Sequence, residues 1–305
     1  MQDLILATSS ECVYSHSKEL LSKYLGIEIS EMQLYRITDY YGELLTTTLA
    51  DNTCLHPLQS DTDVLYAMAD GSMLLTREDN WKEVKLGRIF SGKSCWQIEG
   101  KPNEIDTSQY VSHFGNCHLF TQKMDAVLDA YGNLDDKLIF ITDGAVWLRQ
   151  WIEDAYPRAI AILDFYHAKE YLCAFAKDYF KDEINRKKWV SEQEELMLQS
   201  EVSQVIDRIK LMQKESPIGT AKKVIDYFSA NISRMDYKYY KTIGKGIIGS
   251  GAMESAHRTV IQCRMKLSGQ RWSKKGLTNM LCLRTIKKNN QWNKVIEITK
   301  NKIAA

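Results

Sequence analysis

The chain has 305 residues, 44% of them hydrophobic, and a formal net charge of +1, which is enough to bury one sizeable core and a smaller appended unit. It contains no run of about 18 uncharged apolar residues, and its start, MQDLILATSSECVY, lacks the basic flank and long apolar stretch of a signal peptide. The seven cysteines form no C-x-x-C pair, so neither a zinc cage nor a disulfide framework is indicated. These features predict a cytoplasmic globular protein and argue against a membrane or secreted one.

The near-neutral total hides an uneven distribution of charge. From Asn231 onward, 16 Lys and Arg residues stand against three acidic residues, a net charge of +13, whereas the first 230 residues carry −12. A basic C-terminal quarter is suited to neutralising phosphates, and a solvated helical face is the simpler alternative.

Residues 15–45 are predicted to form two helices with a short break at 27–29 and Ser30 as the cap of the second. This is typical of a helix-turn-helix, whose second helix would present four side chains to base edges: Gln33, Tyr35, Arg36 and Thr38. Two short helices at the edge of any domain give the same pattern, so DNA contact is one of two interpretations. Because the chain begins almost inside the first helix, we expect that preceding residues of the natural protein are missing.

From Asp63 onward the pattern becomes that of strands and then of alternating helices and strands. Strands are predicted at 64–69, 72–76, 83–90, 137–142 and 159–163, with a turn at 77–80. Helices are predicted at 119–131 and 146–155. The order β-β-β-α-β-α-β, with the first three strands in an antiparallel meander, predicts a mixed sheet with flanking helices and ligands beyond its strand ends.

Residues 171–230 are charged and helical in period, which predicts a helical insertion. This insertion could pack on the sheet, pair with a second subunit or support DNA. After it comes GIIGSGAMESAHRTV, whose glycines allow a tight loop that leads into a helix containing Glu254.

Three acidic residues are candidates for a metal site. Asp70-Gly71 and Asp143-Gly144 each follow an apolar, strand-like run, and Glu254 stands in a stretch almost bare of acid. Carboxylates suit Mg²⁺, and two such ions roughly 3.5–4 Å apart activate the nucleophile and stabilise the leaving oxygen in phosphodiester chemistry. We expect each glycine to leave room for substrate, because no side chain intrudes there. Asp-Gly is also a common turn dipeptide, and its placement after apolar strands is what favours the metal site.

Three stretches resemble the DDE transposases of bacterial insertion sequences, most closely the ISKra type, which are distant relatives of Mutator-like transposases. They are MADGSMLLTREDNWKEVKLGRIF, ITDGAVWLRQWIEDAYPRAIAILDFYHAKEYL, and MDYKYYKTIGKGIIGSGAMESAHRTVIQCRMKLSGQRWSKKGLTNMLCLRTIKKNNQW, which together span most of residues 63–292. The resemblance implies an α/β protein with a ribonuclease H-like mixed sheet and a helical insertion. The expected division is a helix-turn-helix-like segment at 1–50, a catalytic core at 60–168 and 240–295, and the insertion at 169–239.

Carried over by position, the resemblance implies a catalytic and metal-binding triad of Asp70, Asp143 and Glu254, holding Mg²⁺ or Mn²⁺. Asp164 and His167 match a second motif near the active site and are expected to support it. A triad of Asp143, Asp164 and Glu254 is the alternative, which would make Asp70 a turn residue. His167 could also simply cap its helix or fill a polar gap in the core.

The remaining motifs concern DNA and strand packing. Trp81 is expected to pack, and Glu83 and Lys85 to form an exposed pair on one strand face. With Arg36, a set near Glu254 is predicted to hold DNA: Arg258, Arg264, Lys266, Arg271 and Trp272. The alternative is that Trp272 belongs to the core and the cations face solvent.

The sequence therefore predicts a transposase that cleaves transposon ends and joins them to target DNA in the cytoplasm, on the nucleoid. Its expected partner is double-stranded DNA, on which it would form a homo-oligomer, with no membrane contact. The alternatives are an inactive or truncated transposase that only binds DNA, and a ribonuclease H-like nuclease acting on another substrate.

Overall fold

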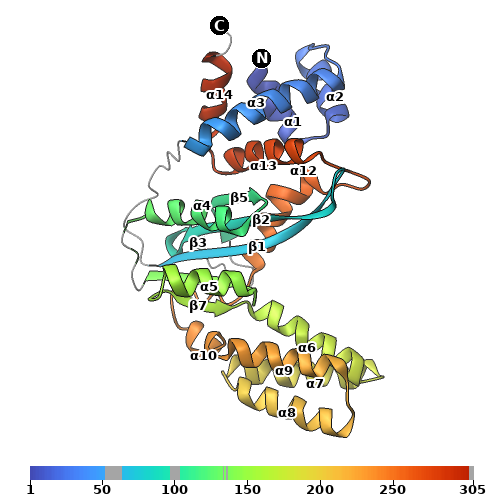
Figure 1. Ribbon diagram of the computed structural model, residues 1–305, viewed down its shortest axis with the longest axis vertical. Coiled ribbons are helices and arrows are strands. Elements are labelled where there is room, and N and C mark those ends of the chain that lie inside the picture. Colours follow the sequence, from blue (N-terminus) through green and yellow to red (C-terminus); the bar gives the residue numbers. More distant parts are fainter. Residues whose placement is uncertain (52–63, 97–103, 133, 135–136, 302–305) are drawn as a thin grey trace.

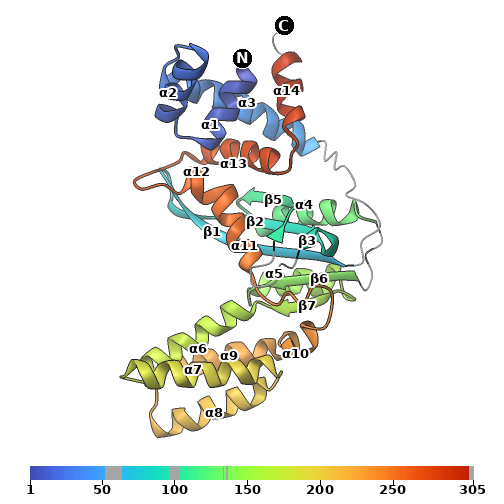
Figure 2. The same cartoon turned by 180° about the vertical axis from the view of Figure 1, so that it is seen from behind.

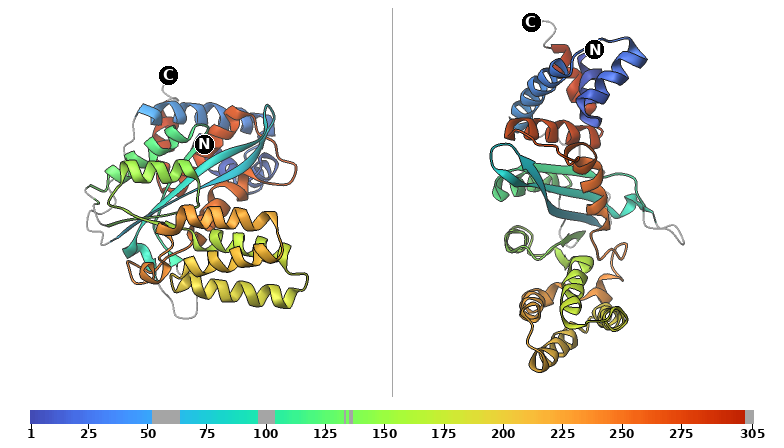
Figure 3. Two further views of the ribbon diagram at one scale, coloured as in Figure 1. Left: turned by 60° about the horizontal axis from the view of Figure 1, so that its bottom comes forward. Right: turned by 90° about the vertical axis from the view of Figure 1, so that its right-hand side faces the viewer.

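The computed structural model describes residues 1–51, 64–96, 104–132, 134 and 137–301. The elements lie in three tiers along the long axis: helices from both ends of the chain, a central β-sheet, and a bundle of helices (Figure 1). The right-hand view of Figure 3 shows the same tiers from the side, with the sheet close to edge-on. None of the helices in these ranges is long and apolar enough to cross a membrane.

The central sheet is mixed and has five strands in the order β5-β2-β1-β6-β7. Their bounds are β1 Leu65–Thr76, β2 Asn80–Ser91, β5 Gln109–Phe114, β6 Leu138–Thr142 and β7 Ile160–Leu163. β2 runs antiparallel to β1 and β5, whereas β6 and β7 run parallel to β1. The predicted α/β class with a mixed sheet is confirmed.

Each face of the sheet has its own apolar core, because side chains alternate along a strand. On one face, Leu65 and Ala67 pack with α4 (Cys117–Asp129) and α5 (Val146–Ala155). On the other face, Tyr66 and Met68 pack with helices from the later part of the chain. This second face is the one toward which the even-numbered residues of β1 point.

The first part of the sheet differs from the prediction in two ways. The strands predicted at 64–69 and 72–76 form one long strand, β1, which begins at Leu65 and stays paired with β2 through Gly71. The Asp70-Gly71 pair predicted a break between two strands. The backbone instead stays extended, because the neighbouring strand β2 is long enough to pair with β1 on both sides of this position. The third core strand is β5, which was not predicted; its polar sequence, QYVSHF, gives little strand signal. The predicted turn between β1 and β2 is confirmed at 77–79.

A small sheet and a 3-10 turn lie between β2 and β5. Their bounds are η1 Gly92–Ser94, β3 Cys95–Trp96 and β4 Glu104–Ile105.

The helical bundle joins the sheet at the end of β7. It consists of α6 Phe165–Tyr179, α7 Glu183–Leu198, α8 Val202–Glu215 and α9 Gly219–Asn231. Buried residues of these helices, among them Leu172, Val205 and Phe228, are continuous with the core on the second face of the sheet. Two short elements, η3 (Ile232–Arg234) and α10 (Tyr237–Tyr240), then return the chain to the sheet.

The tier at the other end combines helices from both termini. Its elements are α1 Gln2–Glu11, α2 Tyr14–Leu25, α3 Glu31–Asp51, α13 Lys274–Lys288 and α14 Trp292–Asn301. Leu6 and Leu45 share a buried cluster with Leu283. A Cβ at Gly42 would lie 2.6 Å from the Cβ of Asn279, so the glycine allows α3 and α13 to lie in close contact. α1 was not predicted.

A helical rod connects this tier to the sheet. Its three segments are α11 Gly251–Ala256, the π-helical stretch η4 His257–Gln262, and α12 Cys263–Met265. α11 packs on β1 and β2, and Figure 2 shows the rod crossing the sheet toward α13. The rod carries the predicted site residue Glu254, so its packing sets the position of that residue.

Candidate functional site

Three aspartates lie in a row across the parallel strands. The last pairs in the register of β1, β6 and β7 join Ala69 to Thr142 and Thr142 to Leu163. The residues one step further along each strand are Asp70, Asp143 and Asp164. The parallel register therefore brings together two members of the predicted triad and one predicted supporting residue.

Asp143 occupies a partly buried position at the end of β6. Its Oδ1 accepts the N–H of Ala145 at 3.0 Å. Burial raises the pKa of the Asp143 carboxyl above its ordinary value, and the charge of Asp70 raises it further, against the opposing effects of the Ala145 N–H, His167 and Arg234. A divalent cation bound by both aspartates would offset the electrostatic repulsion between their carboxylates.

Arg234 is a residue of this site that sequence reasoning missed. Its guanidinium is buried and donates to Thr142 Oγ1 at 2.7 Å and to the carbonyl oxygen of Ile162 at 3.3 Å. It thereby holds the ends of β6 and β7, from which Asp143 and Asp164 follow. The sequence around it, ANISRMDYK, mixes polar and apolar residues and gives no specific signal for a buried arginine.

The glycines after the two aspartates have a different role from the one expected. A Cβ at Gly71 would collide with the Glu83 carboxylate, and one at Gly144 would collide with the ring of Tyr227. The space expected for substrate beside each glycine is occupied by a side chain of the protein itself. The Tyr227 ring also stacks on Tyr171, with ring centroids 4.0 Å apart.

The Glu83–Lys85 pair also differs from the prediction. Lys85 Nζ lies 2.8 Å from Glu83 Oε2, but the Lys85 side chain is only 9% exposed. Lys85 also donates to the Gly115 carbonyl and lies over the ring of Trp147. Trp81, expected to pack, is instead exposed.

Glu254 lies on α11 with its side chain exposed, and its carboxylate makes no hydrogen bond or ion pair with any described residue. Three residues further along the rod, His257 Nε2 lies 3.2 Å from Asp70 Oδ2. Residues three apart on a helix share a face, so Glu254 is on the side of the rod that faces Asp70. Sequence reasoning missed His257, although its spacing from Glu254 in the quoted motif was the available signal.

Asp164 and His167 lie beside these groups at the start of α6. Asp164 is buried, and its Oδ1 accepts the N–H of Tyr166 at 3.0 Å and the N–H of Ser250 at 3.1 Å. His167 is about one third exposed, with Nδ1 3.4 Å from Glu170, and its charge acts on Asp143. Asp164 therefore ties α6 to the loop before α11.

The donor chemistry fits a divalent ion in part. Asp70 and Asp143 supply hard oxygen ligands, and magnesium is commonly held by one or two carboxylates together with substrate phosphates. Within the described ranges, however, no three His, Cys, Asp or Glu side chains are grouped closely enough to hold one ion. Glu254 would complete a set of three ligands only after its side chain, or the rod, moves toward the two aspartates.

The residues predicted to contact DNA divide into exposed and buried sets. Four are exposed: Arg36, Arg258, Lys266 and Arg271. Arg264 and Trp272 are buried, at 1% and 8% exposure, and the prediction that they contact DNA is wrong in this conformation. The Arg264 guanidinium lies between the rings of Tyr14 and Trp272, so these side chains attach the rod to the N-terminal helices.

The helix pair predicted near the N-terminus is present as α2 and α3. Ser30 Oγ accepts the N–H of Gln33 at 3.2 Å, and Gln33 Oε1 accepts the N–H of Ser30 at 3.0 Å, a reciprocal cap. Tyr35 and Arg36 are exposed, but Thr38 is buried and donates to the Leu34 carbonyl. Thr38 is therefore not available to bases.

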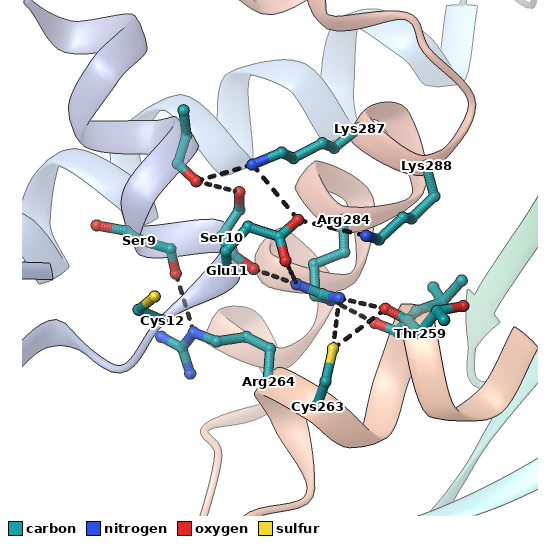
Figure 4. A network of polar contacts seen from close by, with 12 residues as sticks. Ser9, Ser10, Glu11, Cys12, Thr259, Cys263, Arg264, Arg284, Lys287 and Lys288 are labelled. Carbon is teal, nitrogen blue, oxygen red and sulfur yellow. Dashed lines mark hydrogen bonds and ion pairs between the residues drawn. The ribbon is translucent and has the colours of Figure 1, made fainter. Parts of the chain in front are cut away.

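A buried arginine network fixes the middle of the rod (Figure 4). The Arg284 guanidinium donates to the carbonyl oxygens of Thr259, Val260 and Ser10 and pairs with Glu11. Thr259 and Val260 belong to the π-helical stretch, and Ser10 belongs to α1. Arg284 supplies donors for them and joins α1 and α13 to the segment that begins at His257.

The fold and site together define an α/β protein with a row of aspartates at the edge of a mixed sheet and a basic C-terminal region. Residues 45–302 match the uncharacterised protein family UPF0236, so the chain belongs to this family. A search of curated proteins finds none that matches the chain.

Proposed function

We propose that this protein is a metal-dependent transposase with a ribonuclease H-like core, which cleaves the phosphodiesters at transposon ends and joins the ends to target DNA. The observation that carries the proposal is the shared register position of Asp70 and Asp143 on adjacent parallel strands, beneath the helix that bears Glu254. The mixed sheet with helices on both faces, and the helical bundle before Glu254 in the chain, also support it.

In this proposal Asp70, Asp143 and Glu254 are the ligands of Mg²⁺ or Mn²⁺. When bound, the ions supply an activated water or 3′-hydroxyl and stabilise the leaving oxygen. Burial and the charge of Asp70 raise the pKa of Asp143, and a bound cation would offset the repulsion between the two carboxylates. Arg234 and the Ala145 N–H keep the end of β6 in place.

DNA would be held by exposed cations on the rod, on the loop that follows it and on α3. Arg258 lies on the rod, and Lys266 and Arg271 lie in the loop between α12 and α13. These side chains, with Arg36 on α3, are available to neutralise phosphates. The proposed setting is bacterial cytoplasm, with the protein assembled as a homo-oligomer on double-stranded DNA of the nucleoid.

The test is cleavage of DNA that carries the sequences flanking the gene, with and without Mg²⁺. The parent chain is expected to nick the DNA only with the metal, and Asp143→Asn to abolish nicking while DNA binding persists. Products with free 3′-hydroxyls at a fixed end, and their joining to a second DNA, distinguish a transposase from a general nuclease. A parent chain that binds these ends but never cleaves them contradicts the enzymatic proposal.

A DNA-binding protein without catalysis is the second candidate. The specific observation in its favour is that Glu254 is not grouped with the two aspartates. In that case Asp70→Asn, Asp143→Asn and Glu254→Gln would leave every measurable activity of the protein unchanged.

A further inference from the structure

We propose that His257 is a positioning residue that orients the Asp70 carboxylate for metal binding, an inference that rests on the proposed function. His257 is absent from the set of residues that the sequence predicts. Its role is assigned from its contact with Asp70, its burial and its place on the rod.

The contact joins a buried imidazole to a half-exposed carboxylate. His257 Nε2 lies 3.2 Å from Asp70 Oδ2, and the two side chains are 7% and 49% exposed. Neither ring nitrogen of His257 makes a well-aligned hydrogen bond to any described group, Asp70 included, so the approach to Asp70 is a close contact that realignment would turn into a hydrogen bond. A buried imidazole needs a polar partner, and the Asp70 carboxylate is the group within reach. Hydrogen bonds of this kind are often imperfectly aligned before ligands bind and tighten afterwards.

The other oxygen of Asp70 is held as well. Asp70 Oδ1 accepts the N–H of Gly71 at 2.6 Å. With Oδ1 on the backbone and Oδ2 facing His257, both contacts restrain the rotation of the half-exposed carboxylate, and its remaining lone pairs are left for a ligand. Without His257, only the local contact to Gly71 would restrain Asp70.

The backbone around His257 is itself anchored. His257 begins the π-helical stretch, whose carbonyls at Thr259 and Val260 accept from the buried Arg284. Glu254 lies one turn before His257 on the same face of the rod. His257 therefore sets the distance between the strand that carries Asp70 and the helix that carries Glu254.

The simpler alternative is that His257 only fills space beneath the rod. The two roles differ in what they require of the side chain. Packing requires volume, whereas positioning requires an N–H donor that reaches Asp70. His257→Gln keeps such a donor at similar reach, His257→Asn keeps the amide but is shorter, and His257→Leu keeps volume without a donor.

The experiment measures Mn²⁺ binding to the full chain by electron paramagnetic resonance, without DNA. His257→Leu and His257→Asn are expected to weaken binding by about tenfold or more, the usual cost of losing an outer partner of a ligand, and His257→Gln by about threefold or less. His16→Leu, which removes an exposed histidine on α2, is the matched control and should bind as the parent does. Asp70→Asn gives the loss expected when the ligand itself is removed.

Cleavage provides the second readout. With DNA fixed, His257→Asn should raise the Mg²⁺ concentration needed for half-maximal cleavage while His257→Gln restores it. Equal Mn²⁺ affinity in the parent, Asn and Leu variants would overturn the positioning role, even if the parent cleaves DNA. A parent that neither binds Mn²⁺ nor cleaves DNA would instead overturn the proposed function, and the positioning role with it.

Discussion

Asp164 Oδ1 accepts the N–H of Ser250 at 3.1 Å, across 86 residues of sequence. The same oxygen caps α6 through the N–H of Tyr166. One buried carboxylate thus fixes both the start of the helical bundle and the loop that leads to Glu254. This arrangement favours a supporting role for Asp164 over membership of an alternative triad, because Asp164 is buried and its Oδ1 accepts two backbone N–H groups.

Asp164→Ala should lower both stability and cleavage. Loss of the cap is expected to cost about 1–2 kcal/mol in the free energy of unfolding, measured by urea denaturation. Asp182→Ala is the matched control, because Asp182 caps the exposed start of α7 by accepting the N–H of Asn185. The control should lose stability without losing cleavage; equal cleavage by both variants would contradict the link to Glu254.

Arg284→Met should strongly destabilise the protein. The substitution removes the guanidinium donors from carbonyls of α1 and of the π-helical stretch and leaves Glu11 without its buried partner, so a loss of about 3–5 kcal/mol in the free energy of unfolding is expected. Lys288→Met removes a more exposed partner of Glu11 and should cost no more than about 1 kcal/mol. Similar urea midpoints for the two variants would argue against the network as an anchor.

Gly144→Ala should displace Tyr227 from its stack on Tyr171, because a Cβ would occupy the place of the tyrosine ring. We expect a loss of about 1–3 kcal/mol from the resulting overpacking. At Gly251 no described atom lies within 4 Å of an added Cβ, so Gly251→Ala should change stability by less than about 1 kcal/mol. The two unfolding curves, compared with that of the parent, check the prediction.

His113 should make stability depend on pH. Burial lowers the pKa of His113 from 6.5 to about 4, with further lowering by Lys123 and Lys85. Between these two pKa values, the imidazole of His113 binds a proton in the unfolded chain but not in the folded protein. The contribution of His113 to the free energy of unfolding is therefore fully present above pH 6.5 and is lost as the pH falls toward 4. His113→Gln should therefore flatten the pH dependence of the free energy of unfolding in this window. His16→Gln controls for the loss of one histidine.

Substitution of the exposed cations should weaken DNA binding, whereas substitution of the buried Arg264 should lower stability. Lys266→Ala and Arg271→Ala are each expected to weaken DNA binding and to reduce the slope of log affinity against log salt by about one. Arg264→Ala should lower thermal stability instead, because its guanidinium lies between two aromatic rings and donates to the Ser9 carbonyl. Unchanged salt slopes for Lys266→Ala and Arg271→Ala would contradict the proposed interface.

Local patterns predicted much of the fold. The apolar run KLIFIT became β6, and the predicted helix at 146–155 matches α5 residue for residue, because both elements have strong periodicity. The predicted break between two strands at Asp70-Gly71 was wrong, because pairing with the long neighbouring strand β2 overrides the local preference of Asp-Gly for a turn. β5 was missed because its residues alternate weakly between apolar and polar.

The candidate site was only partly accessible from the sequence. Acidic residues after apolar strands indicated Asp70 and Asp143, whose closeness follows from parallel pairing. Burial could not be predicted for Arg264, because it depends on α1 and α2, whose contacts join residues more than 200 positions apart. His257 and Arg234 were missed for the same reason: their partners are distant in the chain.

The pairing of the β1–β2 hairpin with the segment around Trp272 has a consequence for biosynthesis. Trp272 donates its N–H to the Leu75 carbonyl and accepts the N–H of Arg77, which joins the tip of the hairpin to a part of the chain translated much later. During translation, the Leu75 carbonyl and the Arg77 N–H at the hairpin tip lack this partner until residue 272 has left the ribosome. If translation stalls before this point, the unpaired strand edge stays exposed and can pair with other chains. Chaperones bind folding intermediates of this kind.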